Sequence, residues 1–216
     1  MVKINKSQLP DGVKITSEKS YQSDPVFSLI KSDCNNKCYI CEEKEPSGLN
    51  VEHRVAHQGN KALKYDWNNL LLSCYHCNHA KGSKFNNILD CTVVDPEEFL
   101  EVLMMPYPNE YVSVRTLRDT DEAKETAQLL DIVYNGEKTA ILNAECENLR
   151  NRVMKELVSF QQKLIEYFEE NDSEIKQGFW RLIVKMIARN SNFASLKRIV
   201  IRRNSDYMRE FSEYLA

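Results

Sequence analysis

The chain has 216 residues, of which 42% are hydrophobic and 28% charged, and its formal net charge is −3. This length allows one large domain, or a compact catalytic core with a second lobe. The acidic balance argues against a protein that coats nucleic acid by charge alone, so contact with DNA or RNA would need a local patch or a partner. No secretory signal opens the sequence, and no apolar run reaches the roughly 18 residues of a membrane span. We therefore expect a soluble, cytoplasmic protein.

In chain order, three parts are expected from the distribution of residue types. Residues 1–33 form a polar N-terminal segment with one short apolar stretch at 25–30. Residues 34–90 form the expected core, because they hold two cysteine pairs and all four histidines. Residues 91–216 are expected to form a mainly helical lobe that docks a partner or nucleic acid.

Within the last part, short apolar runs broken by prolines come first. We expect strand or loop there, followed by a short helix over residues 96–103 with Asp95 as its N-cap. From about Thr120, apolar residues recur every three or four positions, which predicts helices. A long amphipathic helix is expected from about residue 138 to 170. The next helix would be capped by Asp172 or Ser173 and end near Ala188, and one or two more would close the chain.

A basic stretch lies inside this helical region. Residues 176–205 contain no acidic residue, and three cations four residues apart share one helix face: Arg181, Lys185 and Arg189. The face could follow the phosphates of a nucleic acid. A solvated face, or an interface with an acidic partner, is the alternative that we favour for this pattern.

The cysteines predict a metal centre. Four of the seven form two pairs with two-residue gaps, at Cys38, Cys41, Cys74 and Cys77. Such gaps let two thiolates from one turn meet one ion, and two turns complete a tetrahedral site. We expect structural zinc there, because four thiolates leave no open coordination position. Cys34 is a candidate substitute ligand outside this spacing, while Cys91 and Cys146 are expected to be ordinary buried thiols.

Three motifs lie between and after the cysteine pairs. They are VEH at 51–53, WNNLLLSC at 67–74 and CNHAKG at 77–82. In this order and spacing the sequence resembles the HNH endonuclease family. The resemblance implies an α+β fold: a zinc-stapled ββα-metal core, treble-clef-like, followed by a largely α-helical C-terminal lobe. It also implies metal-dependent hydrolysis of phosphodiester bonds in DNA.

The resemblance gives each motif residue an expected role. His53 would be the general base, because neutral imidazole activates water at physiological pH. Glu52 and Asn78 would be oxygen ligands of catalytic Mg²⁺ or Mn²⁺. Asn69 would hold the loop after His53 through its amide and so orient the imidazole. His57 and Lys81 are candidate substrate contacts.

Alternatives remain open for several of these residues. Adjacent residues of an ideal strand face opposite sides, so Glu52 and His53 can share a site only where the strand ends or bends. The family usually has aspartate at the position of Glu52. Asn78 could instead be a helix N-cap, and the spacing of His53 and His57 superficially resembles a zinc-binding pair. Two further histidines are expected to be structural or phosphate-facing: His76 and His79.

A narrower resemblance covers two longer strings. They are CYICEEKEPSGLNVEHRVAHQGN at 38–60 and YDWNNLLLSCYHCNHAKGSKF at 65–85. Both are similar to the HNH nuclease subunits of the Septu anti-phage systems, the PtuB proteins. The resemblance implies antiviral defence and an ABC-like ATPase partner of the PtuA type. The alternatives are a stand-alone restriction or homing nuclease, and a non-catalytic zinc module that binds nucleic acid or protein.

Overall fold

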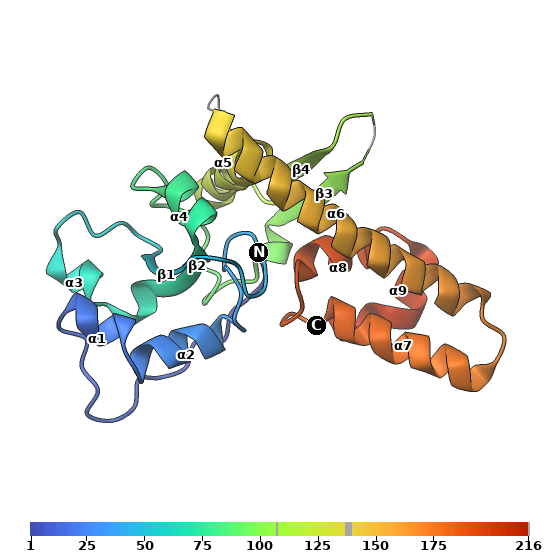
Figure 1. The fold of residues 1–216 in the computed structure, drawn as a ribbon, viewed down its shortest axis with the longest axis horizontal. Helices are drawn as coiled ribbons and strands as arrows, with labels where there is room; N and C mark the ends of the chain where they lie inside the picture. Colours follow the sequence, from blue (N-terminus) through green and yellow to red (C-terminus); the bar gives the residue numbers. More distant parts are fainter. Residues whose placement is uncertain (107, 137–139, 216) are drawn as a thin grey trace.

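A single long helix joins two bodies of the molecule (Figure 1). The computed structural model describes residues 1–106, 108–136 and 140–215. The N-terminal body holds two short β-ribbons and small helices, and the C-terminal body is helical. The α+β class predicted from the sequence is therefore confirmed. No helix in the described ranges is both long and apolar enough for a membrane span.

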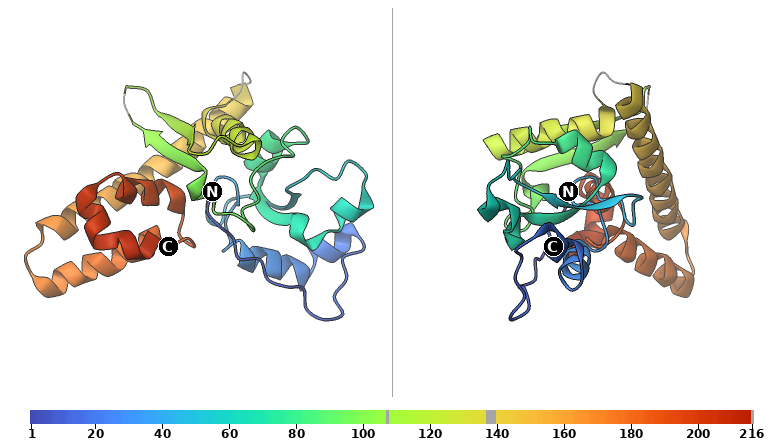
Figure 2. Two further views of the ribbon diagram at one scale, coloured as in Figure 1. Left: turned by 180° about the vertical axis from the view of Figure 1, so that it is seen from behind. Right: turned by 60° about the vertical axis from the view of Figure 1, so that its left-hand side comes forward.

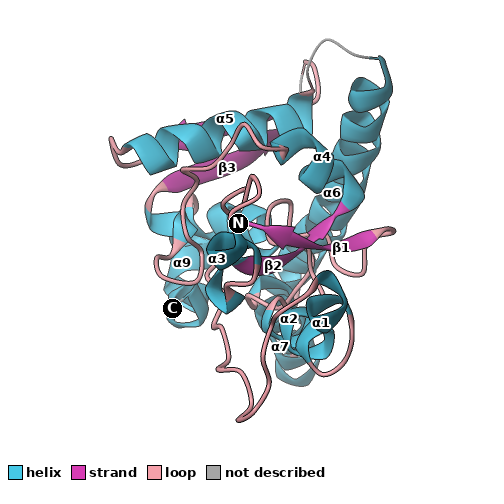
Figure 3. Cartoon of the chain, turned by 90° about the vertical axis from the view of Figure 1, so that its left-hand side faces the viewer, coloured by secondary structure: helices cyan, strands magenta, loops and turns pink. Residues whose placement is uncertain are grey.

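The first ribbon carries the region of the three motifs. Strands β1 (Leu49–His53) and β2 (Leu70–Cys74) pair antiparallel, with Leu49 opposite Cys74 and His53 opposite Leu70. All of β2 is buried, as its apolar run requires. Figure 3 shows this ribbon between helices of the N-terminal segment and the helix that follows β2. The flanking helices are α1 (Glu18–Gln22), α2 (Val26–Asp33), α3 (Lys61–Lys64) and α4 (Tyr75–Lys81).

The second ribbon corrects the helix expected over residues 96–103. Only Pro96–Glu98 is helical, as a single 3₁₀ turn, and β3 begins two residues later at Leu100–Met105. Asp95 caps the turn as expected, accepting a hydrogen bond from the Glu97 backbone N–H at 3.2 Å. Every second residue of β3 is buried, and the strand pairs antiparallel with β4 (Tyr111–Thr116). Pairing with a partner strand therefore outweighs the local helix signal.

The predicted C-terminal helices are confirmed. They are α5 (Asp121–Asn135), α6 (Ala140–Glu169), α7 (Ser173–Ile187), α8 (Ala194–Arg202) and α9 (Ser205–Phe211), followed by a 3₁₀ turn at Ser212–Leu215. Asp172 caps α7 by accepting hydrogen bonds from two backbone N–H groups, at 2.9 and 3.0 Å. The expected start of the long helix near residue 138 lies outside the described residues. Figure 2 shows α7 returning beside the C-terminal half of α6.

Helix α6 contributes residues to two separate apolar clusters. Leu149 and Val153 belong to the cluster that also contains the four paired cysteines, β2 and the buried side of β3. Phe160 and Leu164, further along the same helix, belong to a second cluster with α7 and α9. The expected lobe at 91–216 thus contributes to both cores, and α6 connects them.

The basic stretch finds its acidic partners inside the chain. The Glu97 side chain, only 5% exposed, forms ion pairs with both Arg198 and Arg202 at 2.8 Å. Further pairs join Arg189 to Asp95, Arg203 to Glu101 and Lys197 to Glu156. The pairs with Asp95, Glu97 and Glu101 hold the helical body against the 95–101 segment, and Lys197 pairs with Glu156 on α6, so most of the stretch is not available to phosphates. Among the described ion pairs, none involves Lys176, Arg181 or Lys185.

Candidate active site and metal centres

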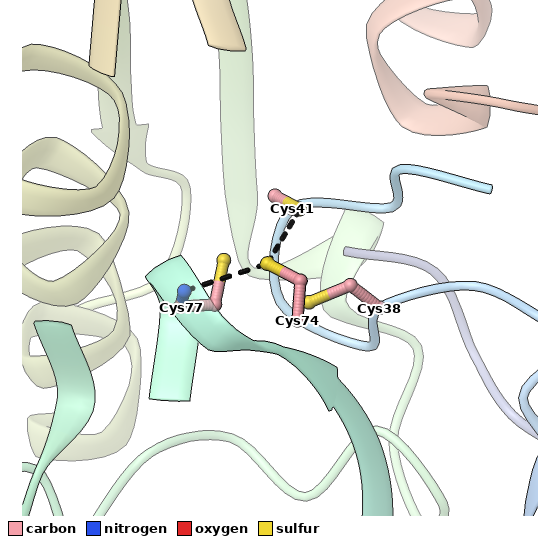
Figure 4. A group of neighbouring side chains, drawn as sticks. All are labelled: Cys38, Cys41, Cys74 and Cys77. Atoms are coloured by element: carbon pink, nitrogen blue, oxygen red, sulfur yellow. Dashed lines mark hydrogen bonds between the residues drawn. The ribbon is translucent and has the colours of Figure 1, made fainter. Parts of the chain in front are cut away.

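The four paired cysteines meet in one buried cluster (Figure 4). Cys38 and Cys41 lie on the loop before β1, Cys74 ends β2 and Cys77 lies on α4. Their sulfur atoms all lie within 4.8 Å of one another, and those of Cys41 and Cys74 are 3.9 Å apart. We call Cys38–Cys41 the first knuckle and Cys74–Cys77 the second. The two knuckles are distant in sequence, but they bring four sulfur donors close enough together to bind one ion.

These four thiols fit a zinc ion. Zinc–sulfur bonds of about 2.3 Å in a tetrahedron place the sulfurs about 3.8 Å apart, close to the 3.9 Å between Cys41 and Cys74. Four thiolates would fill the coordination shell, so zinc here would have a structural role. Cys34 is not part of this group. Its sulfur accepts a hydrogen bond from the Leu72 N–H at 3.4 Å, and burial raises its pKa to about 12.

A pocket of about 310 Å³ opens where β1 ends. Glu52 and His53, the last two residues of β1, both line it. His57 from the following loop and Asn78 from α4 line the same pocket. The structure thus brings together four of the predicted site residues, whereas Asn69 and Lys81 lie outside the pocket lining.

His53 is held in a defined tautomer. Its Nε2 lies 2.9 Å from the backbone carbonyl oxygen of Lys64. A carbonyl oxygen only accepts hydrogen bonds, so Nε2 carries the proton and Nδ1 keeps its lone pair. Burial lowers the pKa of His53, which favours this neutral form at physiological pH.

His57 has the same tautomer as His53. Its Nδ1 accepts a hydrogen bond from the Gly59 backbone N–H at 3.1 Å, so the proton resides on Nε2. The rings of His53 and His57 lie edge to face with centroids 4.8 Å apart. The two imidazoles therefore provide one basic nitrogen and one N–H donor within one pocket.

Asn69 ties together the loop that follows His53. Its Oδ1 accepts from the Val55 N–H at 2.8 Å, and its Nδ2 donates to the carbonyls of Val55 and Leu63 at 2.9 and 3.0 Å. Leu63 precedes the residue whose carbonyl holds the His53 ring. The buried amide thus acts on the imidazole through the backbone and does not touch it.

We expect Asn69→Ala to lower the free energy of unfolding by about 1–3 kcal/mol, because it leaves buried backbone groups of Val55 and Leu63 without partners. Urea titration of the full chain measures this change. Asn68→Ala is the matched control: Asn68 is exposed, and its substitution should change stability by no more than about 0.5 kcal/mol. Equal midpoints for the two variants would contradict the assigned role.

Asn78 is not the N-cap of its helix. Cys74 holds that position, and its sulfur accepts from the Cys77 N–H at 3.4 Å. Asn78 lines the pocket, and its side chain forms no hydrogen bond with any other described residue. Its amide oxygen is therefore free to act as a ligand.

Two side chains contact the Glu52 carboxylate. Its carboxylate, in a residue only 5% exposed, forms an ion pair with Lys81 at 2.8 Å and accepts a hydrogen bond from the Tyr39 hydroxyl at 2.7 Å. Burial raises the pKa of Glu52, while the Lys81 and Tyr39 contacts oppose that rise. An ionised carboxylate offers about four lone-pair sites, so the two contacts leave capacity for a cation. With the amide oxygen of Asn78, this donor set fits a hard divalent ion that keeps several waters.

Lys81 lies beneath the pocket and not at its surface. Its side chain is 0% exposed, and its ammonium also donates to the His53 carbonyl oxygen at 2.9 Å. The geometry therefore does not support the expected contact with a substrate phosphate, and Lys81 instead supports the strand end that carries Glu52 and His53.

The other two histidines lie away from the pocket lining. His76 faces two acceptors, with Nδ1 3.0 Å from the Glu145 carboxylate and Nε2 2.7 Å from the Val133 carbonyl. Burial opposes its charge, but hydrogen bonds to Cys146, Val133 and Glu145 raise the pKa of His76 to about 9. It joins the second knuckle to α5 and α6. His79 is exposed and stacks on Tyr75.

Comparison with known proteins places this site within a recognised region. Residues 38–84 match the model of the HNH endonuclease family. The Septu protein PtuB of Bacillus thuringiensis is 36% identical over 74 residues, which cover 32% of this chain and 29% of that relative. The chain thus matches less than a third of the relative's length. No solved structure matches the chain significantly. The resemblance expected from the motifs is confirmed for this region.

Proposed function

We propose that this chain is a metal-dependent HNH endonuclease that hydrolyses phosphodiester bonds in DNA as part of an anti-phage defence system. One observation carries the proposal: Glu52, His53 and Asn78 line one pocket, inside the residues that match the family. Beside it, four thiols are arranged for a structural zinc ion. The pocket supplies a base and oxygen ligands, which are the groups that phosphodiester hydrolysis requires.

His53 acts as the general base through Nδ1. The Lys64 carbonyl holds the opposite nitrogen at 2.9 Å and so fixes the ring. Nδ1 removes a proton from a water molecule, whose oxygen attacks phosphorus. The bond from phosphorus to the 3′ oxygen then breaks, its electron pair stays on that oxygen, and solvent supplies the proton that the oxygen takes up.

Glu52 and Asn78 would hold the catalytic cation, Mg²⁺ or Mn²⁺. When bound, such an ion polarises the phosphate and stabilises negative charge on the leaving oxygen. His57 contributes an N–H donor from the same pocket. The Gly59 N–H occupies Nδ1, so Nε2–H is the group of His57 that would hydrogen-bond a phosphate oxygen. Such a hydrogen bond would stabilise the negative charge that develops on the phosphate.

An ABC-like ATPase is the partner that we propose, because the similarity to a Septu protein suggests the same kind of system. Large apolar side chains exposed on α6 and α7 support a docking role for the helical body; they are Val158, Ile165, Ile175 and Leu182. An ATPase gene beside the gene for this chain would support the partner. A gene neighbourhood without one, in several related genomes, would contradict it.

Metal dependence tests the proposed activity. We expect the zinc-loaded full chain to nick or linearise plasmid DNA with Mg²⁺ or Mn²⁺, and to leave it intact when EDTA is present. Zinc content is measured after the EDTA treatment, so that loss of the catalytic cation is separated from loss of zinc. A folded, zinc-loaded protein that leaves plasmid and linear DNA intact with both cations, alone and with the neighbouring ATPase, would contradict the proposal.

A further inference from the structure

Tyr39 links the cysteine cluster to the candidate active site. It lies between Cys38 and Cys41, is 2% exposed, and its backbone N–H donates to the Leu72 carbonyl of β2 at 2.9 Å. Its hydroxyl reaches β1, where it donates to Glu52 Oε2 at 2.7 Å. The first zinc knuckle therefore contacts the pocket carboxylate directly.

Lys81 makes the corresponding link from the second knuckle. It lies four residues after Cys77 and one helical turn after Asn78, on α4. Its ammonium contacts Glu52 Oε1 at 2.8 Å and the His53 carbonyl at 2.9 Å. A fully buried ammonium needs such partners, because its desolvation is otherwise uncompensated.

We propose that Tyr39 and Lys81 are positioning residues that fix the Glu52 carboxylate as a ligand for a hard divalent cation. The inference rests on the proposed function, which assigns Glu52 to the cation. Tyr39 contacts one carboxylate oxygen and Lys81 the other, and each oxygen keeps a further lone pair that a cation could use. The zinc centre and the catalytic pocket then form one unit, in which zinc binding sets the geometry of the second metal's ligand.

An ordinary packing role for Tyr39 makes a different prediction. A tyrosine that only fills the core changes stability when its hydroxyl is removed, but it leaves the metal affinity of the folded protein unchanged. Partners that orient a metal ligand behave otherwise, since their removal typically lowers metal affinity about 10–100-fold. Metal binding without DNA therefore separates the two roles.

The experiment is a Mn²⁺ titration of the zinc-loaded full chain, in which electron paramagnetic resonance measures free Mn²⁺. We expect Tyr39→Phe to bind Mn²⁺ about 10–100-fold more weakly than the unmodified chain, with unchanged zinc content. Tyr134→Phe is the matched control. Tyr134 is equally buried and donates to the Cys41 carbonyl at 3.0 Å, so it touches the same knuckle without contacting Glu52.

Three outcomes would overturn the inference: wild-type Mn²⁺ affinity in Tyr39→Phe, an equal loss in Tyr134→Phe, or no Mn²⁺ binding by the unmodified chain. Weaker binding by Tyr39→Phe alone supports it, even if no variant cleaves DNA. That last result would count against the nuclease activity and not against the positioning role. Conversely, Mg²⁺-dependent cleavage with equal Mn²⁺ affinities would leave the nuclease intact and refute the positioning role.

Discussion

Replacing His53 with alanine is expected to slow DNA cleavage about 10²–10⁴-fold, the usual contribution of a positioned general base. The effect should be large because no other basic nitrogen in the pocket has a free lone pair among the described residues. His57 Nδ1 is occupied by the Gly59 N–H, and its Nε2 carries a proton. The variant should keep its zinc, since His53 lies outside the cysteine cluster.

Cleavage rates of supercoiled plasmid at saturating Mg²⁺ measure this effect. His79→Ala serves as the control, because it removes an exposed imidazole from α4 that does not line the pocket. The control should cleave at the wild-type rate. Equal rates for His53→Ala and the unmodified chain, with matched zinc content, would exclude His53 as the base.

The features that the sequence predicted well are those encoded by short spacing. Two C-x-x-C turns predict a four-thiol site, and the structure places the four sulfurs within 4.8 Å. Glu52, His53 and Asn78 come together because β1 and α4 flank one buried strand, whose apolar run is unmistakable. Helices α5 to α7 follow from apolar periodicity and from caps such as Thr120 and Asp172.

Features that depend on distant partners were not predictable in the same way. The basic stretch contains no acidic residue of its own, yet Glu97, about 100 positions earlier in the chain, forms ion pairs with both Arg198 and Arg202. Lys81 looks like a surface cation on a short helix until the fold buries it against Glu52. The strand at 100–105 likewise depends on pairing with β4, and the helix or strand propensity of residues 96–105 alone contains no information about that partner.

Tyr39 illustrates the same limit inside a motif. Its neighbours Cys38 and Cys41 attract attention by their spacing, whereas the tyrosine between them has no spacing rule of its own. Its role emerges only when β1 lies across the knuckle and brings Glu52 to within 2.7 Å of the hydroxyl. The sequence does not show that the Tyr39 hydroxyl is buried or which group it contacts, and both facts require the tertiary structure.

Removing one zinc ligand should have the largest effect on the fold. Cys74 ends β2, caps α4 and belongs to the four-thiol cluster, so Cys74→Ala removes one of the thiols that fit zinc and a helix cap together. Structural zinc sites in small domains contribute about 10–16 kcal/mol at neutral pH, which is comparable to or larger than the stability of a whole domain. We expect residues 38–85 to lose zinc and cooperative structure.

The C-terminal helices should respond less, because Phe160, Leu164 and their partners in α7 and α9 form a separate apolar cluster. Hydrogen–deuterium exchange by segment, with zinc content measured by mass spectrometry, follows both effects in one sample. Cys91→Ala is the control, since Cys91 is equally buried but lies outside the four-thiol group; it should keep one zinc and its protection at 38–85. Full zinc occupancy and unchanged protection in Cys74→Ala would show that the cluster does not hold the core together. Loss of protection that extends from 38–85 into α6 as far as Val153 and stops before Phe160 would show that the zinc-dependent unit ends where α6 passes from the first apolar cluster to the second.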